Sequence, residues 1–333
     1  MAAKRTRQNN RRGTSERKTA VRAAKEENEV TMQIEFKRLE AEDIEKLTRF
    51  YCLRHDNTCD SVILDNFLWR EYYDVRYSVR DDRAVLWVMT IHGKRYASLP
   101  VGRLEDMPKY FKELEQYFNE ELGLPLEIYL ADEEAVAYLN LPPEKYSVTE
   151  LFDSRDYLYS AEALKTLAGK ELHKKKNHLN YFKKNFGERS EYRTLCCSDS
   201  HEVWEFLDKW REQKGQEVEG HLDYEVAGIH EILKNCSLLN VRMGGIFVDG
   251  MLEAFSIGSY NAGEKMAIIH IEKANPEFRG LYQYINQQFL IHEFLEAEIV
   301  NREDDMGLPG LRQAKMSYAP MGFAKKFRIK QIG

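Results

Sequence analysis

The chain has 333 residues, and because a single hydrophobic core stops growing at about 250 to 300 residues, two domains are expected. It is 43% hydrophobic and 31% charged, which excludes a wholly disordered protein. The net charge of −6 argues against a protein that binds nucleic acid over its whole surface. No apolar run approaches the roughly 20 residues of a membrane-spanning helix and no secretory signal is recognisable, so we expect a cytoplasmic protein.

Residues 1–31 differ from the rest, with nine Lys and Arg side chains against four Glu. Few large apolar residues occur there, so we predict a disordered basic tail. It is either an arm for nucleic acid or anionic lipid, or a passenger extension ahead of a start at Met32.

The five cysteines form no CxxC pair and are odd in number, so neither a disulfide framework nor a zinc site is expected. We interpret them as reduced thiols that mostly serve packing: Cys52, Cys59, Cys196, Cys197 and Cys236.

Periodicity and turn residues predict the elements of the first half. Strands are expected over 32–39 and 125–131, with a β-meander over 73–102 that turns at Asp81-Asp82 and His92-Gly93. Helices are expected over 41–54, 59–73, 107–123 and near 133–141. The aromatic side chains of this half suit a core better than a ligand cage, which favours a scaffold role: Phe67, Trp69, Tyr72, Tyr73 and Trp87.

The second half repeats this order of elements. A hairpin is predicted over 244–260 around Asp249-Gly250, followed by strands over 266–274, 298–303 and 325–332. Helices are predicted over 170–186, 200–214, 222–236, 281–296 and 311–319. The repeated order suggests a duplicated α/β unit, with one copy over 32–160 and the other over 161–333.

Three segments of the second half, 173–186, 270–286 and 301–320, together resemble the DUF2156 family. That family is the soluble relative of the phosphatidylglycerol lysyltransferase C-terminal domain. The resemblance implies an α/β (α+β) fold of two tandem GNAT-like units, each a mixed, largely antiparallel sheet flanked by helices, as in bacterial acyltransferases of this type.

The segment IIHIEKA carries the candidate catalytic residues. A strand period of two places His270 and Glu272 on one face, where they would act in general acid/base catalysis. Alternatively, Glu272 pairs with Lys273, Arg279 or Arg312, and His270 only completes a buried network.

In GNAT enzymes that use acetyl-CoA, a glycine-rich turn after this strand holds the CoA pyrophosphate. Here Arg279 and Gly280 occupy its start, but Tyr282 and Tyr284 stand at the two glycine positions. Side chains there hinder a close approach of diphosphate to the backbone, which disfavours CoA. The resemblance to the lysyltransferases implies aminoacyl-tRNA as the donor instead, with Gln283 and Asn286 also on the donor side.

A basic run precedes these motifs and would contact the phosphates of tRNA. The alternative is a solvated basic helix without a ligand. The run comprises Lys170, Lys174, Lys175, Lys176, Lys183 and Lys184, with Asn177 among them.

The segment NREDDMG has two interpretations. Asp304 or Asp305 caps the following helix, or Asn301, Glu303 and Asp305 line an acceptor cleft and hold an ammonium group. Arg312 and Lys315 on that helix would bind a donor phosphate or carboxylate. No spacing is diagnostic of a metal, and the acceptor cleft would further include Lys273, Arg302 and Tyr318.

These features lead to an acyltransferase, with aminoacyl transfer from aminoacyl-tRNA to an amine or hydroxyl acceptor as the leading function. A CoA-dependent GNAT N-acyltransferase is the first alternative, and a non-catalytic RNA- or ligand-binding protein is the second. Expected partners are tRNA and an anionic lipid or small-molecule acceptor, in the cytoplasm or at the membrane periphery.

Overall fold

The computed structural model describes residues 34–214 and 220–333, with side chains left out of the description at 213–221. The predicted basic tail, 1–31, lies outside the described residues. Phe36–Gly333 form one compact unit, and everything below concerns this unit.

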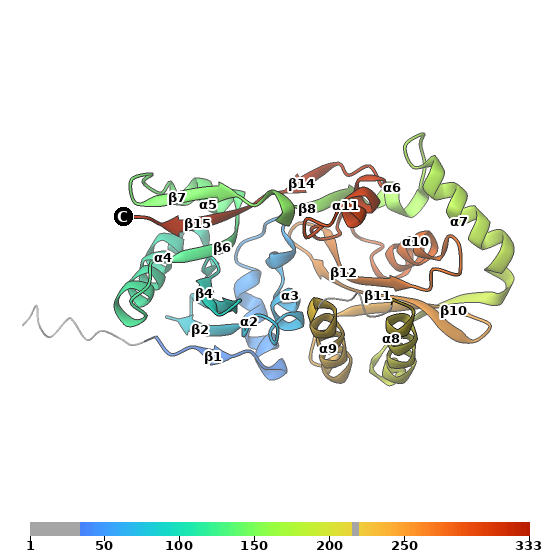
Figure 1. The fold of residues 1–333 in the computed structure, drawn as a ribbon, viewed down its shortest axis with the longest axis horizontal. Helices are drawn as coiled ribbons and strands as arrows, with labels where there is room; N and C mark the ends of the chain where they lie inside the picture. The colour runs from blue at the N-terminus through green and yellow to red at the C-terminus, as the bar shows by residue number, and fades with distance from the viewer. Residues whose placement is uncertain (1–33, 215–219) are drawn as a thin grey trace, which may run out of the picture. The chain divides into compact units, whose positions relative to one another are not determined.

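The first sheet is built mainly by the first half and has the order β1-β2-β3-β4-β6-β15-β7, with β5 paired to β3 (Figure 1). The predicted meander is confirmed, because β2, β3 and β4 pair antiparallel in succession. Its first turn holds Asp81 and Asp82 at φ 51° and 55°, which suits a tight hairpin. The strands are β1 Lys37–Arg38, β2 Arg76–Arg80, β3 Ala84–Ile91, β4 Lys94–Ala97, β5 Val101–Gly102, β6 Glu127–Asp132, β7 Tyr146–Glu150 and β15 Lys326–Gln331.

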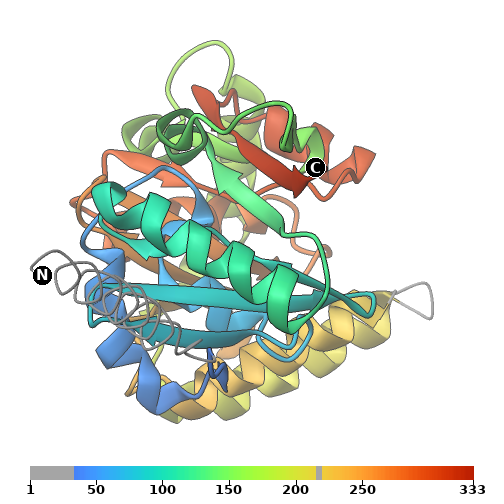
Figure 2. The same cartoon turned by 90° about the vertical axis from the view of Figure 1, so that its left-hand side faces the viewer.

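The helices of the first half mostly follow the predicted order, and Figure 2 shows α4 lying across the strands of the first sheet. The helix predicted over 59–73 is shorter than expected, because α3 ends at Leu68 and Asp74 adopts φ 44°. The helical segments are η1 Ala41–Asp43, α2 Ile44–Tyr51, η2 Cys59–Ser61, α3 Ile63–Leu68, η3 Leu104–Asp106, α4 Met107–Gln116, η4 Tyr117–Glu121, α5 Glu133–Leu139 and η5 Phe152–Ser154.

The second sheet has the order β14-β8-β13-β12-β11-β10-β9. The hairpin predicted at Asp249-Gly250 is confirmed by the antiparallel pairing of β10 and β11. Strands β12 and β13 pair parallel, while the other pairs of this sheet are antiparallel. The strands are β8 Asp156–Ser160, β9 Ser190–Thr194, β10 Arg242–Val248, β11 Met251–Asn261, β12 Met266–Ala274, β13 Ile299–Asn301 and β14 Gly322–Ala324.

Helices cover both faces of the second sheet (Figure 1). On one face, α6, α7 and α10 share a hydrophobic cluster with the sheet, and on the other α8 and α9 pack together with α2 and α3. The helical segments are α6 Ala161–Thr166, α7 His173–Phe186, η6 Gly187–Arg189, η7 Cys197–Asp199, α8 Ser200–Lys214, α9 Gly220–Asn235, α10 Leu281–Glu293 and α11 Pro309–Met316.

The strands are not divided between the two sheets in chain order. Strand β15, near the C-terminus, lies between β6 and β7 in the first sheet, whereas β8 belongs to the second sheet. The division at residues 160 and 161 stays a prediction.

The expectation that all cysteines are reduced is wrong for one pair. Cys197 and Cys236 form a disulfide whose Cα atoms are 5.8 Å apart. Cysteine spacing did not reveal it because the partners are separated by 39 positions and meet only when η7 packs beside the end of α9.

The predicted fold class, a mixed α/β fold of two tandem GNAT-like units with sheets flanked by helices, is confirmed. Among the described residues, no helix is both long and apolar enough to cross a membrane.

Candidate active site

The candidate site lies where β12 and β13 separate. The two strands pair in parallel as far as Ile268 opposite Asn301, after which β12 continues along β11 and the chain after β13 enters a loop. The residues that follow, 269–274 and 302–305, therefore border the place where the strands separate.

A β-bulge at His270 changes the faces of β12. Ile257 of β11 pairs with Ile271 and Gly258 pairs with Ile269, so His270 is left without an opposing residue. A bulge inserts one residue and reverses the alternation of side chains beyond it.

The prediction that His270 and Glu272 share a face is consequently wrong. Ile269 packs in the cluster formed with α10, while Ile271 packs in the cluster formed with α8. His270 and Glu272 contact different partners on opposite sides of the sheet, so they do not form the predicted pair.

His270 is held between two polar partners. Its Nδ1 lies 2.8 Å from Glu303 Oε1, and its Nε2 lies 2.8 Å from Ser259 Oγ. The His270 side chain is 0% exposed, and this burial lowers the pKa of the imidazole to about 4. The imidazole is therefore neutral, with one ring nitrogen bonded to Glu303 and the other to Ser259.

Asp65 of α3 completes this side of the site, and no motif in the sequence had pointed to it. Burial and the neighbouring Glu303 raise the pKa of Asp65 well above its usual value, and burial raises that of Glu303 likewise. No side-chain hydrogen bond or ion pair is made by Asp65 among the described residues. Two adjacent carboxyl groups with raised pKa values form a pair that retains a proton more readily than an isolated carboxyl group does.

The donor atoms of Asp65, His270 and Glu303 lie within 4.8 Å of one another, and a divalent cation would need such spacing. Because His270 Nδ1 is already hydrogen-bonded to Glu303, the arrangement is that of a proton-sharing group. We assign no metal there.

Asn301 is part of the framework beneath this group and does not line an open cleft as predicted. Its side chain is buried and donates to Asp156 at 3.0 Å and to the Asn57 carbonyl at 2.8 Å. Asp156 also pairs at 2.9 Å with Lys326 of β15, which is 1% exposed. The carbonyl oxygen of the Asn301 side chain accepts from Glu303 N at 2.7 Å, which fixes the start of the loop.

The opposite side of the sheet holds a second cluster, around Glu272 and Arg302. The Glu272 carboxylate accepts from Arg302 Nη2 at 2.8 Å and from Asn286 Nδ2 of α10 at 2.9 Å. Arg302 lies over the Tyr318 ring at 4.8 Å, and Tyr318 Oη accepts from Gln283 at 3.1 Å. Four residues predicted for the donor and acceptor sides thus meet here.

Arg302 keeps one unused donor. Its Nη1 is buried and has no hydrogen-bond partner among the described residues. The Nζ atom of Lys175, on α7, lies 4.1 Å from the centre of the same Tyr318 ring. A ligand oxygen would find positive charge and a free N–H group at this position.

Arg312 and Lys315 do not fit the predicted role in binding donor phosphate. Arg312 makes two 2.8 Å contacts with Asp305 and one of 2.7 Å with Asp153. Lys315 Nζ donates to the carbonyl of Arg302 at 2.6 Å. Asp305, whose pKa Arg312 lowers to about 2, is likewise occupied and does not line the cleft.

Lys273 also lies away from the Arg302 cluster. It pairs with Glu225 of α9 at 2.5 Å and sits 4.5 Å above the Trp210 ring. Its predicted place in the acceptor cleft is not supported by these contacts.

The start of α10 is closely covered by α7. Gly280 adopts φ 93°, and a Cβ atom on it would overlap the carbonyl oxygen of His178. Tyr284 stacks on Phe182 of α7 with ring centroids 4.7 Å apart, and Tyr282 is packed against the same hydrophobic cluster. The residues at the glycine positions thus serve helix packing.

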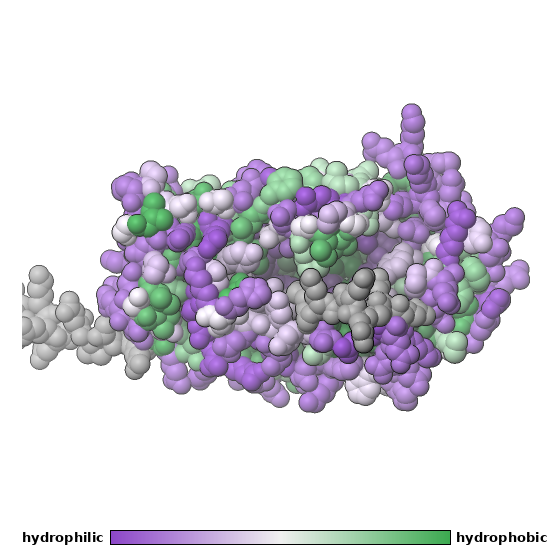
Figure 3. All heavy atoms as spheres, in the orientation of Figure 1, coloured by the Kyte–Doolittle hydropathy of each residue, from purple (hydrophilic) through white to green (hydrophobic). Residues whose placement is uncertain are grey.

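The exposed side of α7 is basic and hydrophilic (Figure 3). Arg279 lies 4.7 Å above the Tyr181 ring, Lys183 donates to Gln287 at 3.0 Å, and Asn177 contacts His173 at 3.4 Å. Among the described residues, none of the cations of this surface forms an ion pair with a carboxylate: Lys170, Lys174, Lys175, Lys176, Lys183, Lys184 and Arg279.

Comparison with known proteins agrees with the fold. The chain resembles a conserved protein of unknown function from Bacteroides thetaiotaomicron, with 25% identity, a TM-score of 0.83 and coverage of 90% of this chain and 100% of that one. A C-terminal domain (DUF2156) described as belonging to a lysylphosphatidylglycerol synthetase of Agrobacterium fabrum has 18% identity and a TM-score of 0.64, with coverage of 88% and 93%. An uncharacterized protein of Mycoplasmoides gallisepticum is 27% identical over 229 residues, which are 68% of this chain and 72% of that protein.

The family described as phosphatidylglycerol lysyltransferase, C-terminal, matches residues 55–330. This range contains both sheets almost completely, together with the His270 and Arg302 clusters. The chain belongs to the family of phosphatidylglycerol lysyltransferase C-terminal domains.

Proposed function

We propose that the protein moves an aminoacyl group from aminoacyl-tRNA to an amine or hydroxyl group of an acceptor. Membership in the family supports acyl transfer, because its description names lysyl transfer to phosphatidylglycerol. An anionic lipid is therefore one acceptor class to test.

The observation that carries the proposal is the free Nη1 of Arg302 beside the basic surface of α7. A buried N–H group without a partner costs about 1 to 3 kcal/mol, so an oxygen of a ligand is favoured there. The Glu272 carboxylate and the Tyr318 ring hold the guanidinium in place. The unpaired lysines of α7 would contact the phosphates of the same donor.

The chemistry requires one proton to move. The acceptor oxygen or nitrogen attacks the ester carbonyl carbon, the bond to the terminal ribose oxygen breaks, and a new ester or amide forms. The proton lost by the acceptor is passed to the departing ribose oxygen. Glu303 suits this transfer, because burial raises the pKa of its carboxyl group well above the usual value while its side chain remains 20% exposed.

His270 is a positioning residue in this scheme. Its side chain is fully enclosed and cannot touch a ligand, but the hydrogen bond between its Nδ1 and Glu303 fixes one oxygen of that carboxyl group. Replacing it should therefore disturb the orientation of the base and not remove the base.

A CoA donor is less well supported. The pyrophosphate of CoA needs open backbone N–H groups at a helix start, whereas α7 packs tightly against Gly280 at the start of α10. This packing favours a donor held by side chains.

The test uses the full-length protein, tRNA charged with a labelled amino acid, and either phosphatidylglycerol vesicles or a soluble amine as the acceptor. Reversing two charges with Lys174→Glu and Lys176→Glu should weaken tRNA binding at least tenfold. The matched control is Lys46→Glu with Lys112→Glu, since these lysines are also exposed on helices and without ion pairs among the described residues.

Equal loss of binding in both double variants would contradict a tRNA site on α7. Acetyl transfer from acetyl-CoA in place of aminoacyl transfer would show that the protein is a CoA-dependent N-acyltransferase. Binding of tRNA without transfer to any acceptor would make the protein an RNA-binding member of the fold.

A further inference from the structure

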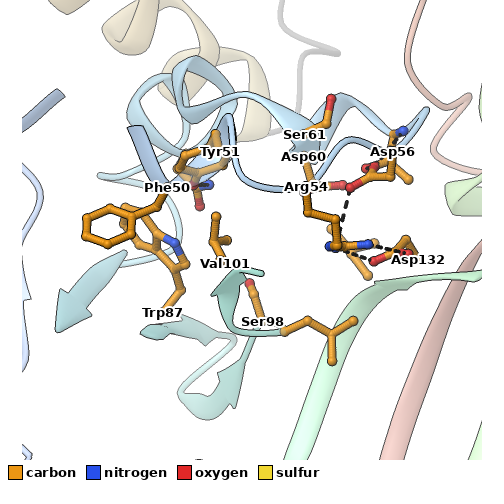
Figure 4. Close-up of a pocket in the computed structure, with 15 residues that line it drawn as sticks. Phe50, Tyr51, Arg54, Asp56, Asp60, Ser61, Trp87, Ser98, Val101 and Asp132 are labelled. Carbon is orange, nitrogen blue, oxygen red and sulfur yellow. Dashed lines mark hydrogen bonds and ion pairs between the residues drawn. The ribbon is translucent and has the colours of Figure 1, made fainter. Parts of the chain in front are cut away.

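The first half contains a pocket that the Glu303 and Arg302 clusters do not use (Figure 4). It lies between the end of α2, the segment before α3, and strands β3 and β6. The polar part of its wall includes Arg54, Asp56, Asp60, Ser61 and Asp132, and the apolar part includes Phe50, Trp87, Leu99 and Val101.

The charges of the pocket are unbalanced. Three carboxyl groups line it, but Asp132 binds Arg54 through contacts of 2.9 and 2.7 Å, and Asp60 pairs with the buried Lys326 at 2.8 Å. One carboxylate is left in excess of the two cations. Asp56 lies 3.5 Å from Arg54 and has a 15% exposed side chain, so it still reaches the pocket. A cation is the ligand charge that this wall favours.

Trp87 supplies a second, independent sign of a ligand. The side chain is 0% exposed, as a core residue should be, yet its Nε1–H has no hydrogen-bond partner among the described residues. Figure 4 shows the indole nitrogen turned toward the side of the pocket where Val101 lies. Buried indole N–H groups are normally satisfied, so a hydrogen-bond acceptor belongs beside it.

The wall of the pocket is also strained. Leu130 adopts φ 61° inside β6, at a bulge where two residues of β6 oppose one residue of β15. This backbone conformation is costly for a residue with a Cβ atom, and strain of this kind collects at ligand sites.

The pocket adjoins the proton-sharing carboxyl groups. Asp60, which lines it, lies within 4.8 Å of Asp65 through their donor atoms, and Asp65 in turn lies within 4.8 Å of Glu303. A ligand anchored in the pocket would thus extend toward the base of the proposed reaction.

We propose that this pocket binds the primary ammonium group of a small ligand that also carries a hydrogen-bond acceptor. Phe50 and Trp87 form the apolar wall beside these carboxylates. The role given to this ligand in the reaction rests on the proposed function. The ammonium group belongs either to the aminoacyl group of the donor or to an acceptor amine.

Binding can be measured without tRNA, by titration calorimetry on the full-length protein. Alanine amide and lysine amide stand for the aminoacyl group, ethanolamine and 3-amino-1-propanol stand for an acceptor amine, and butyramide is the uncharged control. Saturable binding of either the two amino-acid amides or the two acceptor amines, without binding of butyramide, supports an ammonium site in the pocket. The class that binds shows whether the donor or the acceptor supplies the ammonium group. Absence of saturable binding for all four amines overturns the proposal.

Two variants locate the binding. Asp56→Asn keeps the size of the side chain and should weaken binding about ten- to hundredfold, as expected when a hydrogen bond to a charged group is lost. Asp208→Asn, an exposed aspartate on α8, should change nothing. Trp87→Phe should also weaken binding, whereas Trp204→Phe on the surface of α8 should not.

Melting curves with both variant pairs separate ligand loss from unfolding. Unchanged affinity in folded Asp56→Asn and Trp87→Phe proteins would overturn the assignment. If amines bind but no aminoacyl transfer occurs with any acceptor, the pocket stands and the proposed function fails.

Discussion

The carboxyl groups of Asp65 and Glu303 approach within 4.8 Å of each other, although Asp65 belongs to α3 and Glu303 follows β13. Each group disfavours ionisation of the other, so the pair is less stable when both are charged. The pKa of Asp65 is raised, and a raised carboxyl pKa lowers folding stability as pH increases toward and through that pKa.

Replacing Asp65 with Asn should remove this repulsion. We expect the free energy of unfolding at pH 8 to increase, because the neutral amide carries no charge to repel Glu303. Urea denaturation at pH 5.5 and pH 8 measures the effect, with Asp208→Asn as the exposed control. A gain that is equal at both pH values would show that charge repulsion is not its cause.

The buried His270 imposes the opposite pH dependence. Its pKa is lowered from 6.5 to about 4, so the unfolded chain binds a proton more readily and stability falls as pH decreases from 6.5 to 4. The loss attributable to this residue is about 3 kcal/mol at most. The His270→Gln protein should show a flatter profile over this range, whereas His201→Gln, at an exposed position, should retain the steep one.

Gly280 is required for the contact between α7 and α10. In the Gly280→Ala protein the new Cβ atom meets the His178 carbonyl oxygen at a φ of 93°, and we expect a loss of about 2 kcal/mol or more. Gly310→Ala is the matched control, because nothing lies within 4 Å of its Cβ position and Ala favours a helix. Similar melting temperatures for the two proteins would contradict the close packing.

The disulfide between Cys197 and Cys236 should stabilise the chain. For a separation of 39 residues, loop-closure entropy predicts a contribution of about 4 kcal/mol. Adding a reductant should therefore lower the melting temperature of the wild type and leave the Cys197→Ser protein unchanged. Cys196→Ser should behave as the wild type, and a response to reductant in the Cys197→Ser protein would point to a different bond.

The sequence predicted most of the elements, because hydrophobic period and turn residues are local properties. The Asp249-Gly250 hairpin and the helices around α7, α8 and α10 illustrate this. Local patterns cannot show a bulge, however, so the period of two placed His270 and Glu272 on one face.

The sequence also predicted part of the candidate site. Arg302, Glu272, Asn286 and Tyr318 do meet, since one stretch of chain carries them to the ends of β12 and β13. The sequence did not show that Arg312 pairs with Asp305 and Asp153, which occupy its guanidinium. Asp65 was missed because its role arises only from packing between distant parts of the chain.

The placement of β15 has a consequence for how the protein is made. This strand fills the gap between β6 and β7, and its Lys326 is the buried cation beside Asp156. The first sheet therefore cannot close until Lys326–Gln331 have left the ribosome, although its other strands emerge much earlier. During synthesis, β6 and β7 must wait with unpaired edges, and an early release of the chain would leave both sheets incomplete.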